Sequence, residues 1–249
     1  LNFGYPQEME ILYCSDNQIT TLDLTTFSTN LTSFRCEDNF ISNLDFSNVN
    51  PMSVACGPVS SPIQIENCTN LQYLSMKDMQ QGNINFSNFS NLTQAYFWNV
   101  DINAIDLSNS TNLNYFSVYN AQNLTYINLK CGKTWGGSIP SIYPISISSC
   151  PNLSFICADP QNVSQLQTLV AYYPSNNQNV NINSYCSFTP GGNFNTITGA
   201  SQFDLNNNGC DINDFPVQYL SLDVSIDAVS TNSSVYTNSL GNYSLFTSQ

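Results

Sequence analysis

The sequence predicts a mainly β solenoid with coils of about 21 residues. An apolar position recurs at a nearly constant interval, at Leu31, Pro51, Leu71, Leu92 and Leu113, with spacings of 20, 20, 21 and 21 residues. Each unit contains two short segments in which apolar and polar residues alternate, as in strands with one buried face. No unit shows the 3.6-residue period of a helix. Stacked coils would therefore place equivalent strands side by side around one continuous core.

The residues within one period identify the type of repeat. Residues 31–41, LTSFRCEDNFI, match Leu-x-x-Leu-x-Leu-x-x-Asn-x-Leu, with an apolar residue or Cys at each required position and Asn39 at the asparagine position. This is the leucine-rich-repeat pattern. We assign residues 1–186 to a leucine-rich-repeat solenoid with its C-terminal cap, and we expect Leu153 to resume the recurring position after one irregular unit.

The alternating segments place each side chain on one of two faces. The inward position of the first segment is occupied in successive units by Cys14, Cys36, Cys56, Met76, Phe97 and Val118. In the second segment, one outward position is occupied by Asp23, Asp45, Gln64, Asn85, Asp106 and Asn128. Amides alternating with carboxylates predict a solvated polar ladder and argue against a catalytic carboxylate pair. We also expect Asn17 and Asn39 to bond to the backbone of their turns, a position that later becomes Val59, Met79, Val100 and Ala121.

The repeat pattern ends in three different segments. Residues 130–143 break the period and are predicted to form an inserted loop. Asp159 followed by Pro160, with apolar residues at Val163, Leu166, Leu169 and Val170, predicts a short amphipathic helix that covers the last coil. Residues 187–249 alternate between short apolar runs and turn residues, which predicts a β-sandwich, complete or partial.

The cysteines divide into two groups. There are nine, so at least one is unpaired. Because Cys14, Cys36 and Cys56 share their position with apolar residues, we expect them to be buried free thiols. Cys68 and Cys150 are expected to share a second buried position, three residues before the recurring one, with Ser28 and Ser110. The sequence leaves the pairing open for Cys131, Cys157, Cys186 and Cys210.

The composition limits the chemistry. There is no histidine, which excludes Ser-His-Asp and Cys-His nucleophile systems and histidine metal sites. Four basic residues against 17 acidic ones give a net charge of −13, so we expect no nucleic-acid partner. No apolar run reaches the roughly 18–20 residues that span a bilayer. We therefore expect a protein that is not an enzyme.

One segment matches a calcium-binding pattern. Residues 204–209, DLNNNG, fit Asp-x-[Asp/Asn]-x-[Asp/Asn]-Gly, in which alternate side-chain oxygens wrap the ion and the glycine permits a sharp turn. Position 12 is Phe215, where glutamate is expected, so Asp211 and Asp214 would have to replace it. The alternative is an asparagine-rich solvated turn. The expected ligands are Asp204, Asn206, Asn208, Asp211 and Asp214.

The units LYCSDNQITTLDL (12–24) and FRCEDNFISNLDF (34–46) resemble the leucine-rich repeats of exported surface proteins from Bacteroidetes. Residues 185–192, YCSFTPGG, and the Asn-rich segment from Phe203 to Asp211 are similar to the region after those repeats, where a B-type or carboxypeptidase-regulatory-like β-sandwich begins. The resemblance implies an extracellular or cell-surface location. It also implies export by the type IX secretion system, although no C-terminal sorting domain of that kind is recognisable in the sequence.

Five aromatic residues point to a binding surface. The outward positions of the first segment bring together Tyr73, Tyr96, Trp98, Tyr115 and Tyr119 in three consecutive units. Aromatic side chains on a solvent face supply large rigid contact area. We expect a secreted or cell-surface protein that acts in adhesion or recognition and uses the solenoid face to bind protein or glycan. One alternative is a structural spacer that presents another domain, and a remote one is a polysaccharide-active enzyme. Another possibility is that a loop near Trp135 covers these rings and makes them core.

Overall fold

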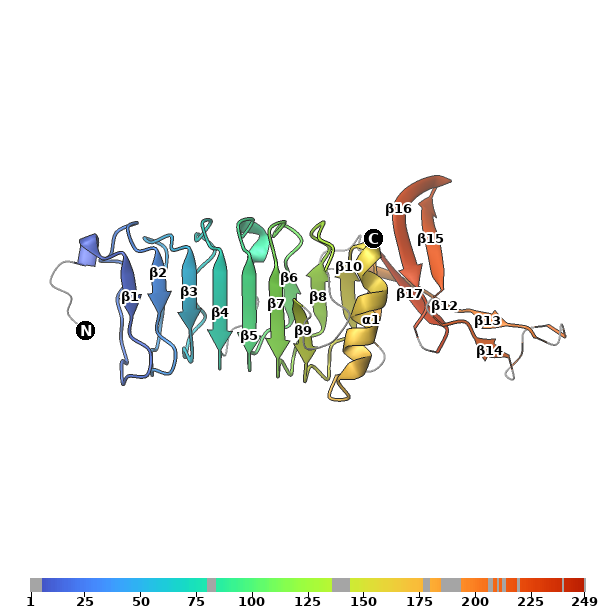
Figure 1. Ribbon diagram of the computed structural model, residues 1–249, viewed down its shortest axis with the longest axis horizontal. Helices are drawn as coiled ribbons and strands as arrows, with labels where there is room; N and C mark the ends of the chain where they lie inside the picture. Colours follow the sequence, from blue (N-terminus) through green and yellow to red (C-terminus); the bar gives the residue numbers. More distant parts are fainter. Residues whose placement is uncertain are drawn as a thin grey trace.

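The computed structural model describes residues 6–79, 84–135, 144–176, 180–184, 194–205, 208, 209, 211, 214–218, 220–238 and 240–248. Two parallel sheets lie back to back along an elongated body (Figure 1). The front sheet contains, in spatial order, β1 (Ile11–Tyr13), β2 (Ser33–Arg35), β3 (Ser53–Cys56), β4 (Tyr73–Lys77), β5 (Gln94–Trp98), β7 (Tyr115–Tyr119) and β9 (Ile145–Ser148). The back sheet contains β6 (Ala104–Asp106), β8 (Tyr126–Leu129), β10 (Phe155–Ala158) and β11 (Asn181–Asn183). The predicted mainly β solenoid with one short helix is confirmed.

The front sheet stacks its strands in register. Cys56 lies beside Met76, Met76 beside Phe97 and Phe97 beside Val118, so the predicted inward position is a continuous row. Cys36, Cys56, Met76, Phe97 and Val118 are all buried. Cys14, Cys36 and Cys56 are free thiols, as predicted, and Cys14 in the first coil is only partly buried. Burial raises the pKa of Cys56 to about 12, which keeps this thiol protonated.

The two asparagines of the first coils bond to their turns as predicted. The Asn17 amide donates to the carbonyls of Cys14 and Ser15, and the Asn39 amide donates to those of Cys14, Cys36 and Glu37. Asn39 Oδ1 also accepts the Ile19 N–H at 3.0 Å. Asn176, which follows the helix, acts in the same way for the last coil, because it accepts the Cys150 N–H and donates to the Ile147 carbonyl.

The polar position of the second segment forms the same type of turn in successive coils. In five of the six units the Asp or Asn side chain accepts the backbone N–H two residues further along, at 2.8–3.0 Å. These acceptors are Asp23, Asp45, Asn85, Asp106 and Asn128. Hydrogen bonds from Thr25 hold the pKa of the Asp23 carboxyl below its ordinary value. Since an amide oxygen can make the same bond, Asp and Asn exchange freely at this position.

The structure corrects the register after the insertion. Ile147 of β9 lies beside Val118 in the front sheet, whereas β10 pairs with β8 in the back sheet. Leu153 is therefore the counterpart of Leu124, not of Leu113. Cys150 follows Ser149, which has a positive φ like Asn120, so it occupies the position of Ala121 and not that of Cys68. The error arose because the unit before the insertion has a small residue three positions before a leucine at two turns, Ser110 before Leu113 and Ala121 before Leu124.

The predicted capping helix is present, but its start is held differently from what we expected. A 3-10 turn, η4 (Pro160–Asn162), leads into α1 (Val163–Tyr172), whose buried residues are Val163, Leu166, Leu169 and Val170. The helix packs on β9 and β11. Asp159 makes no side-chain cap bond; its carboxylate instead accepts the Gly132 N–H at 2.8 Å, and Asn162 bonds to Lys133 and Trp135. These side chains tie the inserted loop to the cap.

Among the residues described after 193, the strands form three two-stranded antiparallel pairs. They are β12 (Phe194–Ala200) with β17 (Asn242–Ser248), β13 (Gln202–Phe203) with β14 (Phe215–Pro216), and β15 (Ser221–Ile226) with β16 (Val229–Tyr236). Buried Asn183 and Ser184 join them to the solenoid, since Asn183 Nδ2 donates to the Ser244 carbonyl and Ser184 Oγ donates to the Ser234 carbonyl, both at 2.8 Å. A sandwich is not confirmed by this pairing.

Replacing Asp106 tests the repeated turn. Asp106→Asn keeps an oxygen for the Ser108 N–H, so we expect little change in the free energy of unfolding measured in urea. Asp106→Ala removes that acceptor and should cost about 0.5–1.5 kcal/mol. If the two variants lost equal amounts of unfolding free energy, the charge of Asp106 would matter, and not the hydrogen bond that its oxygen accepts from the Ser108 N–H.

The thiols give a second test. After alkylation of the denatured, unreduced chain, mass spectrometry should find label on the cysteines that are free among the described residues, which are Cys14, Cys36, Cys56, Cys68, Cys131 and Cys150. In the folded protein Cys14 should react fastest of these six, because it is only partly buried. Deeper burial blocks access to the other five and raises the pKa of each. A disulfide joining any two of Cys14, Cys36 and Cys56 would show that the row of thiols is misassigned.

Candidate ligand-binding face

The front sheet presents the five predicted aromatic residues on its outer side. Trp98 is 54% exposed, Tyr115 51% and Tyr119 38%, while Tyr73 and Tyr96 are partly exposed. Trp135, which we considered as a cover, is itself buried in the hydrophobic core. The inserted loop is described only as far as Trp135, and up to that residue it leaves the aromatic side chains open.

The aromatic residues form two contacting pairs across adjacent coils. The ring centroids of Trp98 and Tyr119 lie 4.4 Å apart with a tilt of 32°, and those of Tyr73 and Tyr96 lie 5.5 Å apart. In the ladder Trp98 is directly opposite Tyr119, whereas Tyr73 and Tyr96 are diagonal neighbours. The Tyr96 hydroxyl donates to Gln94 Oε1 at 3.1 Å, and burial raises the pKa of Tyr96, so the phenol remains a donor. Contacts of this kind fix the rings before any ligand arrives.

Arg35 extends this surface toward the first coil. Its guanidinium carbon lies 5.3 Å from the Tyr13 ring centroid and 5.9 Å from that of Tyr73, within the range of cation–π attraction. We did not include Tyr13 or Arg35 among the site residues, although both occupy outward positions in the sequence pattern. The register of the first two strands could have identified them, because it places Tyr13 directly beside Arg35.

The third coil leaves a low strip in the face. Its outward residues are Ser53, Ala55 and Gly57, and the last two are buried between larger neighbours. Gly57 has φ +128°, and a Cβ there would overlap the backbone carbonyl oxygen of Lys77. Across this strip Lys77 Nζ meets Asp38 Oδ1 at 2.7 Å, and the hydrogen bond raises the pKa of Lys77. An exposed pair of this kind adds at most about 1 kcal/mol, so its main effect is to neutralise the lysine.

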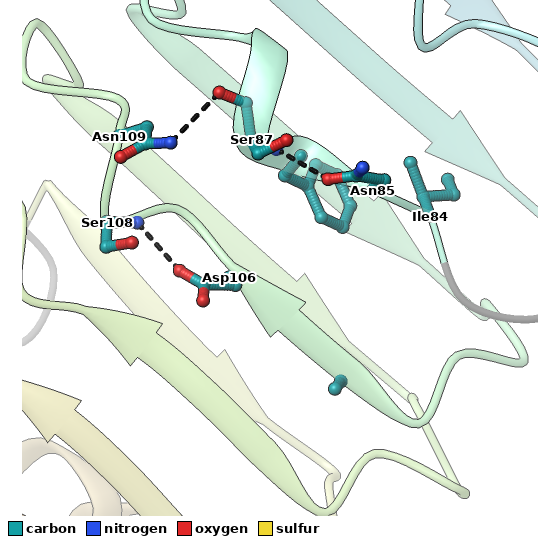
Figure 2. A pocket seen from close by; sticks show the side chains of 8 residues that line it. Ile84, Asn85, Ser87, Asp106, Ser108 and Asn109 are labelled. Carbon is teal, nitrogen blue, oxygen red and sulfur yellow. Dashed lines mark hydrogen bonds between the residues drawn. The ribbon is translucent and has the colours of Figure 1, made fainter. Parts of the chain in front are cut away.

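A pocket of ≈ 220 Å³ lies on the opposite side, beside the free edge of β6 (Figure 2). Three of the labelled side chains, those of Asp106, Asn85 and Asn109, already have backbone partners. Asp106 accepts the Ser108 N–H, Asn85 accepts the Ser87 N–H, and Asn109 donates to the Ser87 carbonyl at 3.0 Å. Because these groups serve the turns, the pocket offers no carboxylate pair arranged for acid–base chemistry.

The expected calcium loop lies only partly within the described residues. Asp204 accepts the N–H groups of Asn208 and Gly209 at 3.2 and 2.9 Å, and Asp214 accepts the Asp211 N–H at 2.7 Å. Asn206 is outside the described residues. No group of three Asp, Glu, Cys or His side chains that could hold a metal occurs among the residues that are described. The carboxylates of Asp204 and Asp214 thus accept backbone N–H groups, and calcium binding stays a prediction.

The open cysteine pairing is resolved in part. Cys131 is a free buried thiol, whereas Cys157 takes part in a disulfide. Cys186 and Cys210 lie outside the described residues. Burial raises the pKa of the Cys131 thiol to about 11, so it has no thiolate character for a nucleophile.

No family model matches the chain, and no curated protein matches it. Among solved structures, it is similar to the functional domain of InlJ from Listeria monocytogenes, which is described as including a cysteine ladder, with 18% sequence identity and a TM-score of 0.46. The alignment covers 99% of this chain and 63% of that one, so the chain spans less than two thirds of its neighbour. Within the described residues, no helix is long and apolar enough to span a bilayer.

Calcium can be tested by melting curves. If the loop from Asp204 to Asp214 binds the ion, calcium should raise the melting temperature and a chelator should lower it, because a ligand held only by the folded state stabilises that state. Asp204→Asn keeps one oxygen for the turn but removes a charge, so it should lose the calcium response. A melting temperature that is the same with calcium and with chelator would leave the loop as a solvated turn.

Proposed function

We propose that this chain is a binding module that uses the front sheet to hold a partner protein outside the cell. The surface runs from Tyr13 in the first coil to Tyr119 in the sixth. With strands about 4.8 Å apart, these six strands span about 24 Å. That length suits an extended protein segment laid across the strands. The resemblance of the repeats to exported surface proteins supports the extracellular location.

The observation that carries this proposal is the exposed, mutually contacting set of aromatic side chains. A solenoid needs apolar residues only at its inward positions, and those are filled along the whole front sheet. Trp98, Tyr115 and Tyr119 stand outside that core and keep a third or more of their surface in water. Aromatic residues held rigid by their neighbours lose little entropy on binding, which is why they dominate protein interfaces.

The alternative is a spacer that only presents another domain. The solenoid is long and stacked in register, as a spacer would be, and its polar side chains mostly serve turns. A spacer, however, gains nothing from the Tyr73–Tyr96 and Trp98–Tyr119 pairs, because their exposed rings cover no core. The aromatic surface therefore favours binding.

Double replacement of Tyr73 and Tyr96 by alanine tests the proposal on an array of extracellular proteins and glycans. We expect binding of the protein ligand to weaken about tenfold or more, since central aromatic contacts carry a large share of interface energy. The matched control is Phe40→Ala, because Phe40 is 69% exposed and lies outside the front sheet.

Both variants should keep the melting temperature of the parent protein. Unchanged binding in the double variant, with the fold intact, would favour the spacer. A large drop in melting temperature would mean that the two tyrosines serve stability.

A further inference from the structure

We propose that the turn ridge beside Trp98 and Tyr119 forms a subsite for one ring of a neutral sugar. This inference goes beyond protein binding, because the hydrogen-bonding groups of the subsite lie on the turn ridge and not on the strands of the front sheet. The ridge consists of the residues that follow the strands of the front sheet, where Asp78, Asn99 and Asn120 all have positive φ between 52° and 55°. Asn99 directly follows Trp98, and Asn120 directly follows Tyr119.

The side chains of the ridge form a chain of hydrogen bonds from coil to coil. Asn99 Nδ2 donates to Asp78 Oδ1 at 2.6 Å, and Asn120 Nδ2 donates to Asn99 Oδ1 at 2.8 Å. Gln122 Nε2 then donates to Asn120 Oδ1 at 2.7 Å. These bonds fix the orientation of each amide before any ligand binds.

Each of the two asparagine amides keeps unused capacity. An amide has two N–H donors and an oxygen with two lone pairs. Asn99 and Asn120 each give one N–H and accept one bond within the chain, so each retains one donor and one acceptor position. The two amides lie on adjacent coils and are joined by a 2.8 Å hydrogen bond, so their remaining donors and acceptors can engage neighbouring hydroxyls of one sugar. Each hydroxyl both donates and accepts.

A cavity of ≈ 200 Å³ lies between these two turns. Its lining is Asn99, Val100, Asp101, Asn120, Gln122 and Asn123, so buried Val100 is the one apolar residue in it. The volume is below the roughly 300–1,000 Å³ of sites for drug-sized ligands, which suits a single ring. An apolar peptide side chain would leave the surrounding amides without partners at a cost in binding energy.

The charges select for a neutral ligand. The lining contains the Asp101 carboxylate, which accepts from Asn123 Nδ2 at 2.7 Å, and the ridge ends at the Asp78 carboxylate. No basic residue lines the cavity, and the chain has a net charge of −13. Lys77 lies opposite Trp98 in the front sheet but is already paired with Asp38, so a sugar acid would meet repulsion here. The neighbouring Trp98 and Tyr119 rings supply an aromatic platform for the C–H face of the next ring of an oligosaccharide.

The test is a titration of the isotope-labelled chain with glucose, galactose, mannose and N-acetylglucosamine, with glucuronic acid as the charged counterpart. At least one neutral sugar should shift the side-chain amide signals of Asn99 and Asn120 at millimolar concentrations. Asn99→Ala or Asn120→Ala should reduce the affinity for that sugar by about two- to tenfold, as expected for one or two lost hydrogen bonds. Glucuronic acid should bind more weakly than glucose.

The matched control is Asn67→Ala, an exposed asparagine outside the cavity, which should bind sugar as the parent does. Tyr73→Ala should also leave the sugar signals unchanged, so failure of protein binding and failure of the sugar subsite can be told apart. The proposal is overturned if no neutral sugar shifts these amides, if glucuronic acid binds as well as glucose, or if extended peptides shift them and sugars do not.

Discussion

The stacking of each coil on the next in register is the constraint on which the rest of this structure depends. A side chain in the front sheet has as neighbours the side chains at the same position one coil before and one coil after. A position must therefore suit its own row as well as its own coil. The row from Cys14 through Cys36, Cys56, Met76 and Phe97 to Val118 satisfies this with very different residues, because all are apolar and face inward, and all but Cys14 in the first coil are buried. The same constraint turns isolated Asp and Asn residues into a ladder of identical turns on the opposite side.

Much of the fold could be predicted because the period appears directly in the residues. Period-two alternation located the front strands, and the substitution of Asp by Asn indicated a structural carboxylate. Prediction failed where the period was interrupted. Leu153 and Cys150 fit one repeat position in sequence but occupy another, since the inserted loop hides which of two similar turns they belong to. Asp159 looked like a helix cap, yet it binds Gly132, a contact 27 residues away that local pattern cannot reveal.

The candidate site, too, could be predicted from the sequence only in part. Alternation alone placed Tyr73, Tyr96, Trp98, Tyr115 and Tyr119 on one face, because outward positions in neighbouring coils have to meet. Sequence could not show that Trp98 pairs with Tyr119 and Tyr73 with Tyr96, or that Arg35 lies over two tyrosines, since side-chain direction decides these contacts. Nor could it show the hydrogen-bonded amides of Asn99 and Asn120, which depend on the positive φ of both residues.

The low third coil, with Ser53, Ala55 and Gly57, separates Arg35 from the aromatic cluster of the front sheet and sets the distance between them. Arg35 reaches Tyr73 only because a single coil lies between them. Duplication or loss of one coil would change that distance by about 4.8 Å and leave the coils on each side unchanged, since coils contact only their neighbours. The number of coils between the arginine and the aromatic cluster therefore sets the distance between them in discrete steps. Recombination that adds or removes a coil could change this distance during evolution without replacing a contact residue.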